Sequence, residues 1–157
     1  MVDVTDPSRP VYVGLLAVED GTAQDIKVYA DHAFFIGADS TGMPVFDLRR
    51  LRGVSGFPVT LTADARYDGI ASAHNLVIDT QSGFAFPVGA SGGGDTCGGG
   101  LHMVDIRNPT TPTFAGCYTD TEGLIWQGRT HDGQCVEYIG PDQDFQGHQI
   151  CFASNET

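Results

Sequence analysis

The hydrophobic positions of the chain come in short runs that are separated by turns. Paired runs rich in β-branched and aromatic residues recur at residues 26–29 with 32–37, 75–78 with 84–89, and 134–138 with 149–153. Two such runs around a turn are typical of a β-hairpin. No stretch carries apolar residues at helical spacing. The pattern therefore predicts an all-β chain.

A sequence motif, which we call the repeated phrase, recurs between these hairpins. Residues 2–14 and 103–116 both read as an aspartate between apolar residues, two prolines three positions apart, and a short strand that ends near a glycine. Residues 45–48 hold a partial copy. The aspartates of the copies are 44 and then 58 residues apart, at Asp3, Asp47 and Asp105. A period of about 45 residues with four strands is typical of a propeller blade.

We therefore expect a partial β-propeller of about three blade equivalents, built from four-stranded antiparallel blades in an open arc. Residues 1–16 would form half a blade, 17–66 and 67–120 a blade each, and 121–157 the first half of another. Because propellers close with four to eight blades, this division predicts a fragment whose remaining blades lie elsewhere in a longer chain. A β-sandwich is the alternative, but it would not predict the repeated phrase.

Several phrases resemble those of LVIVD-repeat propellers. Residues 101–105 look like the LVIVD repeat, and residues 45–47 look like a degenerate copy. The order of phrases is similar to that of the choice-of-anchor B family of bacterial surface proteins; the matching phrases lie at 25–29, 72–75, 97–103, 114–117, 130–136 and 150–152. The resemblance covers most of residues 25–157 and implies a secreted or cell-surface protein, with its export signal and anchor outside this segment. It implies no reaction.

The net charge of the chain limits the classes of partner that it could bind. The formal net charge is −12, with one lysine, Lys27, among eight basic residues. This balance argues against a nucleic acid or an anionic membrane surface as partner. No apolar run is long enough to insert into a membrane. The acidity favours solubility, and cation binding through aspartate-rich loops is the alternative.

Four cysteines are present, and none is spaced as in a zinc finger. An even number in a lysine-poor chain favours an oxidising compartment, with free thiols of a cytosolic protein as the alternative. Cys135 and Cys151 flank a turn centred near Gln143, so antiparallel strands would bring them opposite each other and within bridging distance. Elimination pairs Cys97 with Cys117, although the expected register places His102, not Cys97, opposite Cys117.

Polar residues precede or begin the first strand of each unit. They are Asp25, His74, Asn75, His131 and Asp132. The first strand of a propeller blade is the innermost, so these side chains would converge near one end of the central channel. Such a set suits a divalent metal ion or a small polar ligand. The alternative is that each residue caps its own turn or bonds a neighbouring blade.

Other motifs favour structural roles. Residues 89–93 fit the G-x-S-x-G pattern, but the glycine-rich segment that follows cannot hold the helix a nucleophile elbow needs, and we expect a surface loop. His32 and His148 flank hairpin turns and are expected to be exposed, whereas His102 is expected to pack or hydrogen-bond inside its blade. Trp126 is expected to pack in a core or between blades rather than to form a sugar platform.

Two classes of function follow. The first is a non-catalytic extracellular scaffold that presents a propeller face to a protein or a glycan. The second is a metal- or small-ligand-binding propeller, or an enzyme, with an Asp/His site at the central channel. We expect the first, because no nucleophile–base pair and no strong metal motif is visible in the sequence.

Overall fold

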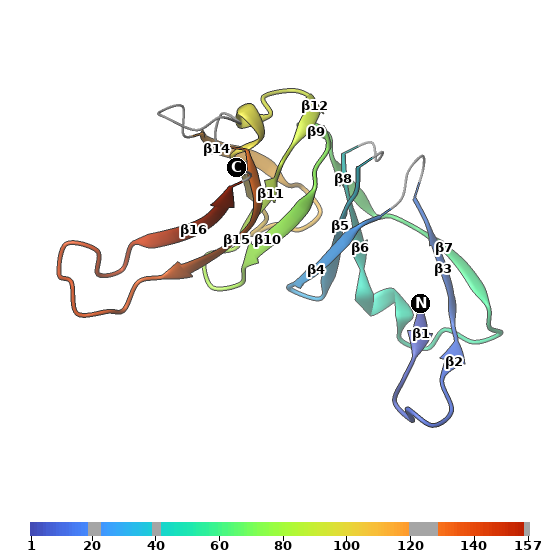
Figure 1. Cartoon of the computed structure of the whole chain (residues 1–157). Helices are drawn as coiled ribbons and strands as arrows, with labels where there is room; N and C mark the ends of the chain where they lie inside the picture. The colour runs from blue at the N-terminus through green and yellow to red at the C-terminus, as the bar shows by residue number, and fades with distance from the viewer. Residues whose placement is uncertain (19–22, 39–41, 120–128, 156–157) are drawn as a thin grey trace.

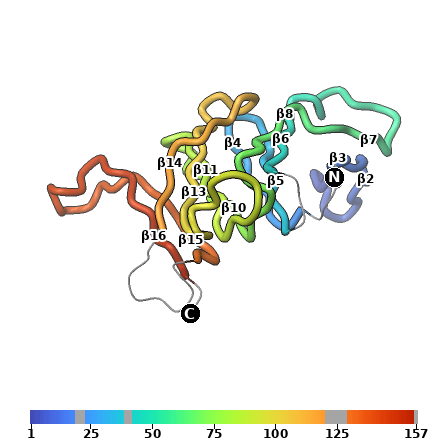
Figure 2. Tube along the Cα trace, turned by 90° about the horizontal axis from the view of Figure 1, so that it is seen from above, coloured from blue at the N-terminus to red at the C-terminus, as the bar shows by residue number. Residues whose placement is uncertain are grey.

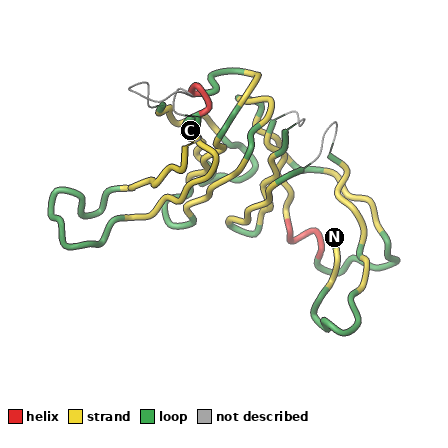
Figure 3. Tube along the Cα trace, viewed as in Figure 1, coloured by secondary structure: helices red, strands yellow, loops and turns green. Residues whose placement is uncertain are grey.

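The computed structural model describes residues 1–18, 23–38, 42–119 and 129–155. Strands dominate, and the helical elements of these residues are two short 3₁₀ turns, η1 (Leu48–Leu51) and η2 (Cys97–Gly99) (Figure 3). None of the described helices is long and apolar enough to cross a membrane. The all-β expectation is confirmed.

Two four-stranded antiparallel sheets form the centre of the molecule. The first has the strand order β4 (Asp25–Tyr29), β5 (His32–Ile36), β6 (Met43–Asp47) and β8 (Ala65–Tyr67). The second has the order β10 (Asn75–Asp79), β11 (Phe84–Val88), β13 (Leu101–Asp105) and β14 (Thr113–Tyr118). A hairpin of β15 (Thr130–Glu137) and β16 (Gln149–Asn155) follows, and the sheets form an arc that does not close (Figures 1 and 2). A partial propeller agrees with this arrangement, and the blade boundaries stay predictions.

Three smaller pairs complete the described strands. They are β1 (Val2–Asp3) with β2 (Val11–Tyr12), β9 (Ile70–Ser72) with β12 (Ser91–Gly93), and β3 (Gly14–Ala17) with β7 (Val59–Thr62). The last pair is parallel, unlike the antiparallel units expected. Gly14 permits it, because a Cβ there would lie 1.9 Å from the carbonyl oxygen of Val59.

The hydrophobic core lies between successive sheets. Leu76 of β10 is buried among residues of the first sheet such as Phe34 and Val45. Its neighbour Val77 belongs to a second cluster with Phe86 and Cys135 of β15. Because successive strand residues point to opposite faces, the middle sheet is covered on both sides. The sheets therefore stack face to face.

The repeated phrase forms the same hairpin twice. Asp3 faces Val11 in the β1–β2 pair, and Asp105 faces Thr113 in the β13–β14 pair. Both pairings join an aspartate to the residue eight positions later. The internal similarity of the sequence therefore corresponds to a repeated structural unit.

The aspartate of each copy shapes the turn that follows its strand. Its carboxylate accepts a hydrogen bond from the backbone N–H two residues later: Asp3 from Thr5 at 2.9 Å, Asp47 from Arg49 at 2.9 Å and Asp105 from Arg107 at 3.0 Å. This side-chain turn is a recurrent role of aspartate in loops. The repeated aspartates thus have a structural explanation.

Candidate functional site

The predicted site residues lie along three adjacent strands. β4 and β10 are edge strands of their sheets, β15 pairs on one side with β16, and β10 contacts both β4 and β15 (Figure 1). Asp25 and Asn75 begin their strands, His74 immediately precedes β10, and His131 and Asp132 follow the first residue of β15. We call these five residues the inner-strand edge.

Asp25 joins the first sheet to the second. Its Oδ2 accepts a hydrogen bond from the backbone N–H of Leu76 on β10 at 3.1 Å. Lys27 lies 2.7 and 2.8 Å from the two carboxylate oxygens, and the N–H of Ile26 donates at 2.8 Å. Partial burial raises the pKa of Asp25, but the hydrogen bonds from Lys27, Leu76 and Ile26 outweigh it and leave the pKa below its ordinary value. This ionised carboxylate therefore ties two sheets together.

His74 and His131 join the second sheet to the third. Their ring centroids are 4.2 Å apart, with an angle of 47° between the planes. The register of β15 shifts between Thr130 and Asp132, so His131 lies at a bulge. A bulge redirects a side chain relative to a regular strand. The two imidazoles consequently meet although their strands belong to different sheets.

Asn75 and Asp132 make local hydrogen bonds. Asn75 Oδ1 accepts from the N–H of Leu76 at 2.8 Å, and Asp132 Oδ1 accepts from the N–H of Gly133 at 2.7 Å. Asp132 is exposed, and Asn75 is half-buried. These contacts fit the alternative in which each polar residue caps its own backbone.

The inner-strand edge is assembled in pairs rather than as one cluster. Among the described residues, one group of three His, Cys, Asp or Glu ligand atoms lies within 4.8 Å of one another, and it is Cys97, His102 and Cys117. The edge therefore offers an imidazole pair and a separate, hydrogen-bonded carboxylate. A metal or ligand at these residues stays a prediction.

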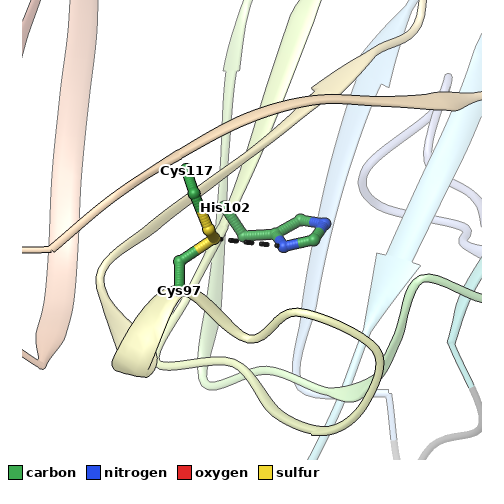
Figure 4. Close-up of side chains that lie close together, drawn as sticks. All are labelled: Cys97, His102 and Cys117. Atoms are coloured by element: carbon green, nitrogen blue, oxygen red, sulfur yellow. Dashed lines mark hydrogen bonds between the residues drawn. A yellow bond between two sulfur atoms is a disulfide. The ribbon is translucent and has the colours of Figure 1, made fainter.

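Both expected disulfides are present. Cys135 and Cys151 face each other in the β15–β16 register, with a Cα–Cα distance of 4.0 Å. Cys97 and Cys117 are bridged over a Cα–Cα distance of 5.3 Å. His102 is the register partner of Cys117, as expected, and Cys97 reaches the bridge from η2 rather than from the paired strand (Figure 4).

His102 lies fully buried beside the second bridge. Its Nδ1 is 2.7 Å from the carbonyl oxygen of Asp95 and 3.4 Å from Sγ of Cys97, while Nε2 is 2.8 Å from the hydroxyl of Tyr67. A carbonyl only accepts, so Nδ1 carries the proton and the Tyr67 hydroxyl donates to Nε2. Burial lowers the pKa of His102 and outweighs the contacts with Asp95 that raise it, so the pKa lies below its ordinary value, which favours the neutral ring.

The sequence predicted that His102 packs or hydrogen-bonds inside its blade, but it did not indicate the contacts of His102 with Cys97 and Tyr67. The available signal was a histidine within an apolar strand, five residues after a cysteine. The contact itself depends on η2, where Cys97 has a φ of 55° and turns back toward the strand. A positive φ at a residue other than glycine is uncommon and cannot be read from the spacing.

Two expectations need correction. Ser91 lies in β12 rather than in a loop, and its hydroxyl is 2.7 Å from that of Ser72, so residues 89–93 form no nucleophile elbow. His32 is buried rather than exposed, because its Nδ1 bonds the carbonyl of Ala30 at 2.6 Å and folds the ring onto the turn. His148 is exposed as expected. Trp126 lies outside the described residues.

Comparison with known proteins adds one finding. Residues 96–120 match the model of the LVIVD repeat. They span η2 and the β13–β14 hairpin, and therefore include a full copy of the repeated phrase. No curated protein and no solved structure matches the chain. The chain thus contains a segment similar to the LVIVD repeat, which supports the LVIVD-repeat family, in a fold consistent with a partial propeller.

Proposed function

We propose that the chain acts as an extracellular or cell-surface β-propeller scaffold of the choice-of-anchor B type, which binds a protein or a glycan and catalyses no reaction. The LVIVD match and the stacked four-stranded sheets support the scaffold. The two disulfides support an oxidising environment, where such bonds form and persist.

The observation that carries the binding role is the continuity of the inner-strand edge. Asp25 bonds the backbone of β10, and His74 meets His131 of β15, so these two contacts link three successive sheets and place their polar residues in a row of separate pairs. Polar side chains held on rigid strands favour recognition of a polar partner. A ligand that contacts this row would touch all three sheets at once.

The chemistry of the described residues supports binding without catalysis. All four cysteines are bridged, so none offers a free thiol. The hydroxyl of Ser91 contacts another serine hydroxyl rather than a base. A nucleophile needs a neighbouring base or a lowered pKa to be activated.

Arrays of oligosaccharides and of secreted proteins test this proposal. We expect the oxidised protein to retain at least one partner, and His74→Ala with His131→Ala to weaken that binding by at least about tenfold, because two polar contacts are removed. His148→Ala, an exposed histidine on the β15–β16 hairpin, is the matched control and should bind as the unmodified protein does. Equal binding by the double variant would contradict the role of the edge, and binding of no partner would contradict the scaffold proposal.

A second candidate function is binding of a divalent metal ion by the same edge. The contact between the imidazoles of His74 and His131 favours it, because histidine is the commonest metal ligand in proteins. Calorimetric titration of the oxidised protein with Zn²⁺ tests this alternative. We expect one bound ion and at least about tenfold weaker binding in His74→Ala, with His148→Ala unchanged. Identical affinities in the two variants would reject the metal site.

A further inference from the structure

A group of potential metal ligands lies away from the inner-strand edge, around the Cys97–Cys117 bridge (Figure 4). We propose that reduction of this bridge by a dithiol creates a Zn²⁺ site, with Cys97, Cys117 and Nδ1 of His102 as ligands. The proposal is independent of the function proposed above, since it concerns a different part of the second sheet.

The distances already suit a metal ion. The two sulfur atoms and an imidazole nitrogen all lie within 4.8 Å of one another, and Cys97 Sγ is 3.4 Å from His102 Nδ1. In a tetrahedral zinc site, a sulfur at about 2.3 Å and a nitrogen at about 2.1 Å from the ion are about 3.6 Å apart. Once the S–S bond is broken, the sulfurs need only move apart to admit the ion between them.

The reduction and the binding step balance. The dithiol supplies two electrons and two protons, the S–S bond breaks, and two thiols form while the dithiol becomes a disulfide. Zn²⁺ then displaces the two thiol protons to water, because the thiolate is the form that binds metal. Cys117 on β14 is an exposed residue, whereas Cys97 is buried, so we expect the dithiol to attack the sulfur of Cys117.

His102 must change tautomer to bind the ion. Its Nδ1 proton is now directed at the Asp95 carbonyl, and metal binding requires the proton to be on Nε2 instead. The Tyr67 hydroxyl, 2.8 Å from Nε2, can accept that proton as a hydrogen bond, because a hydroxyl both donates and accepts. Partners of this kind fix the tautomer of metal-bound histidines. Tyr67 is therefore a positioning residue for the site.

The other disulfide provides an internal control. Cys135 packs against Val77 and Phe86, and no ligand group of the described residues joins Cys135 and Cys151 within 4.8 Å. Reduction of both bridges thus yields one dithiol with an imidazole and one without. Only the former has the third ligand of a structural or catalytic zinc site.

Titration with Co²⁺, a coloured substitute for Zn²⁺, tests the proposal. The bridges are reduced with a water-soluble phosphine, which becomes its oxide as water supplies the oxygen and the two protons. We expect one Co²⁺ per chain with a thiolate charge-transfer band in the reduced protein and in Cys135→Ser with Cys151→Ser. Cys97→Ser with Cys117→Ser should lose the band, and the oxidised protein should not develop it.

The variant Tyr67→Phe tests whether Tyr67 positions the His102 ring for metal binding, separately from any effect on folding. We expect its affinity for Co²⁺ to fall by about 10–100-fold, while the band at saturating Co²⁺ keeps its position. The proposal is overturned if the reduced protein binds Co²⁺ no more tightly than Cys97→Ser with Cys117→Ser, or if Tyr67→Phe leaves the affinity unchanged. Loss of the β-sheet circular dichroism on reduction would also overturn it, because the site requires the folded second sheet.

Discussion

Two of the repeated aspartates bind an arginine side chain in addition to stabilising a turn. Arg49 and Arg107 each contact the carboxylate two residues before them, Asp47 and Asp105. Hydrogen bonds from the arginine are the largest cause of the low pKa of both carboxyl groups, about 2 against an ordinary 3.8. The turn is thus stabilised by an ionised group that protonates only in strong acid.

Replacement of Asp105 by asparagine should lower stability in a pH-dependent way. The folded-state pKa of about 2 lies below the ordinary value of 3.8, so the contribution of this carboxylate is fully present above that value and is lost as the pH falls toward 2. Urea unfolding at pH 7, 4 and 2.5 should show Asp105→Asn less stable at pH 7, with the gap closing in acid. A difference in the free energy of unfolding that does not depend on pH would contradict this account. Asp144→Asn, at an exposed aspartate, serves as the control.

The hydroxyl of Tyr67, a buried core residue, contributes to stability through its hydrogen bond to His102. Tyr67→Phe removes the donor to Nε2 of the fully buried His102 and leaves that nitrogen unsatisfied. We expect the free energy of unfolding to fall by about 1–3 kcal/mol, the cost of a buried polar atom without a partner. Chemical denaturation of the oxidised protein measures it. Tyr118→Phe, at an exposed tyrosine of β14, should change stability little, and equal effects would refute the role of the bond.

At the level of single residues, the sequence predicted which cysteines are bridged better than it predicted the burial and side-chain contacts of the histidines. The Cys135–Cys151 bridge could be predicted because both cysteines lie symmetrically about one turn. The burial of His32 could not, since it results from a side-chain bond to the carbonyl of Ala30. The ring contact between His74 and His131 depends on the β15 bulge, which no local pattern indicated.

Among the elements, β10 has the central position. It contacts β4 on one side and β15 on the other, and its residues supply both hydrophobic clusters. Leu76 is completely buried between the first two sheets, whereas Ile26 on β4 is 53 % exposed. The two residues are of similar size, so they form a matched pair for measuring how much the packing of one sheet against the next contributes to stability.

Leu76→Ala should therefore destabilise far more than Ile26→Ala. We expect a loss of about 2–5 kcal/mol for the first, because a cavity remains between the sheets. For the second, a surface position, we expect a change within about 0.5 kcal/mol. Thermal and chemical unfolding check this, and equal losses would contradict the stacked-sheet core.

The hairpins were predictable from the sequence, whereas the pairing of the remaining strands was less predictable. Alternating apolar residues with turns between them marked β4–β5, β10–β11 and β15–β16. The parallel pairing of β3 with β7 was not foreseen, because it joins segments more than forty residues apart through the close approach at Gly14. Strand β12 contains two glycines and carries no hydrophobic signal of its own.

At the scale of the whole molecule, apolar surface is exposed on the first four-stranded sheet and on the last hairpin. On the first sheet, Ile26 and Val28 are 53 % and 54 % exposed; on the last hairpin, Val136 and Phe152 are 36 % and 66 % exposed. Contiguous apolar faces and unpaired strand edges favour association.

We therefore expect the isolated chain to self-associate. Sedimentation velocity should show dimers or larger species whose fraction rises with concentration. Ile26→Thr with Val28→Thr keeps the β-branched shape of strand residues but reduces the apolar area, and should shift the distribution toward the monomer. A monomer at all concentrations, or no effect of the double substitution, would count against the exposed faces as the cause.

The two disulfides also determine how the chain responds to a pulling force. Each bridge closes a loop inside a single sheet, of 20 residues for Cys97–Cys117 and 16 for Cys135–Cys151. At about 3.5 Å per extended residue, these loops withhold about 70 Å and about 55 Å of contour length from extension. Under a pulling force, a stretched molecule would therefore stop lengthening at the bridges and keep parts of the β13–β14 and β15–β16 hairpins connected until a reductant releases them.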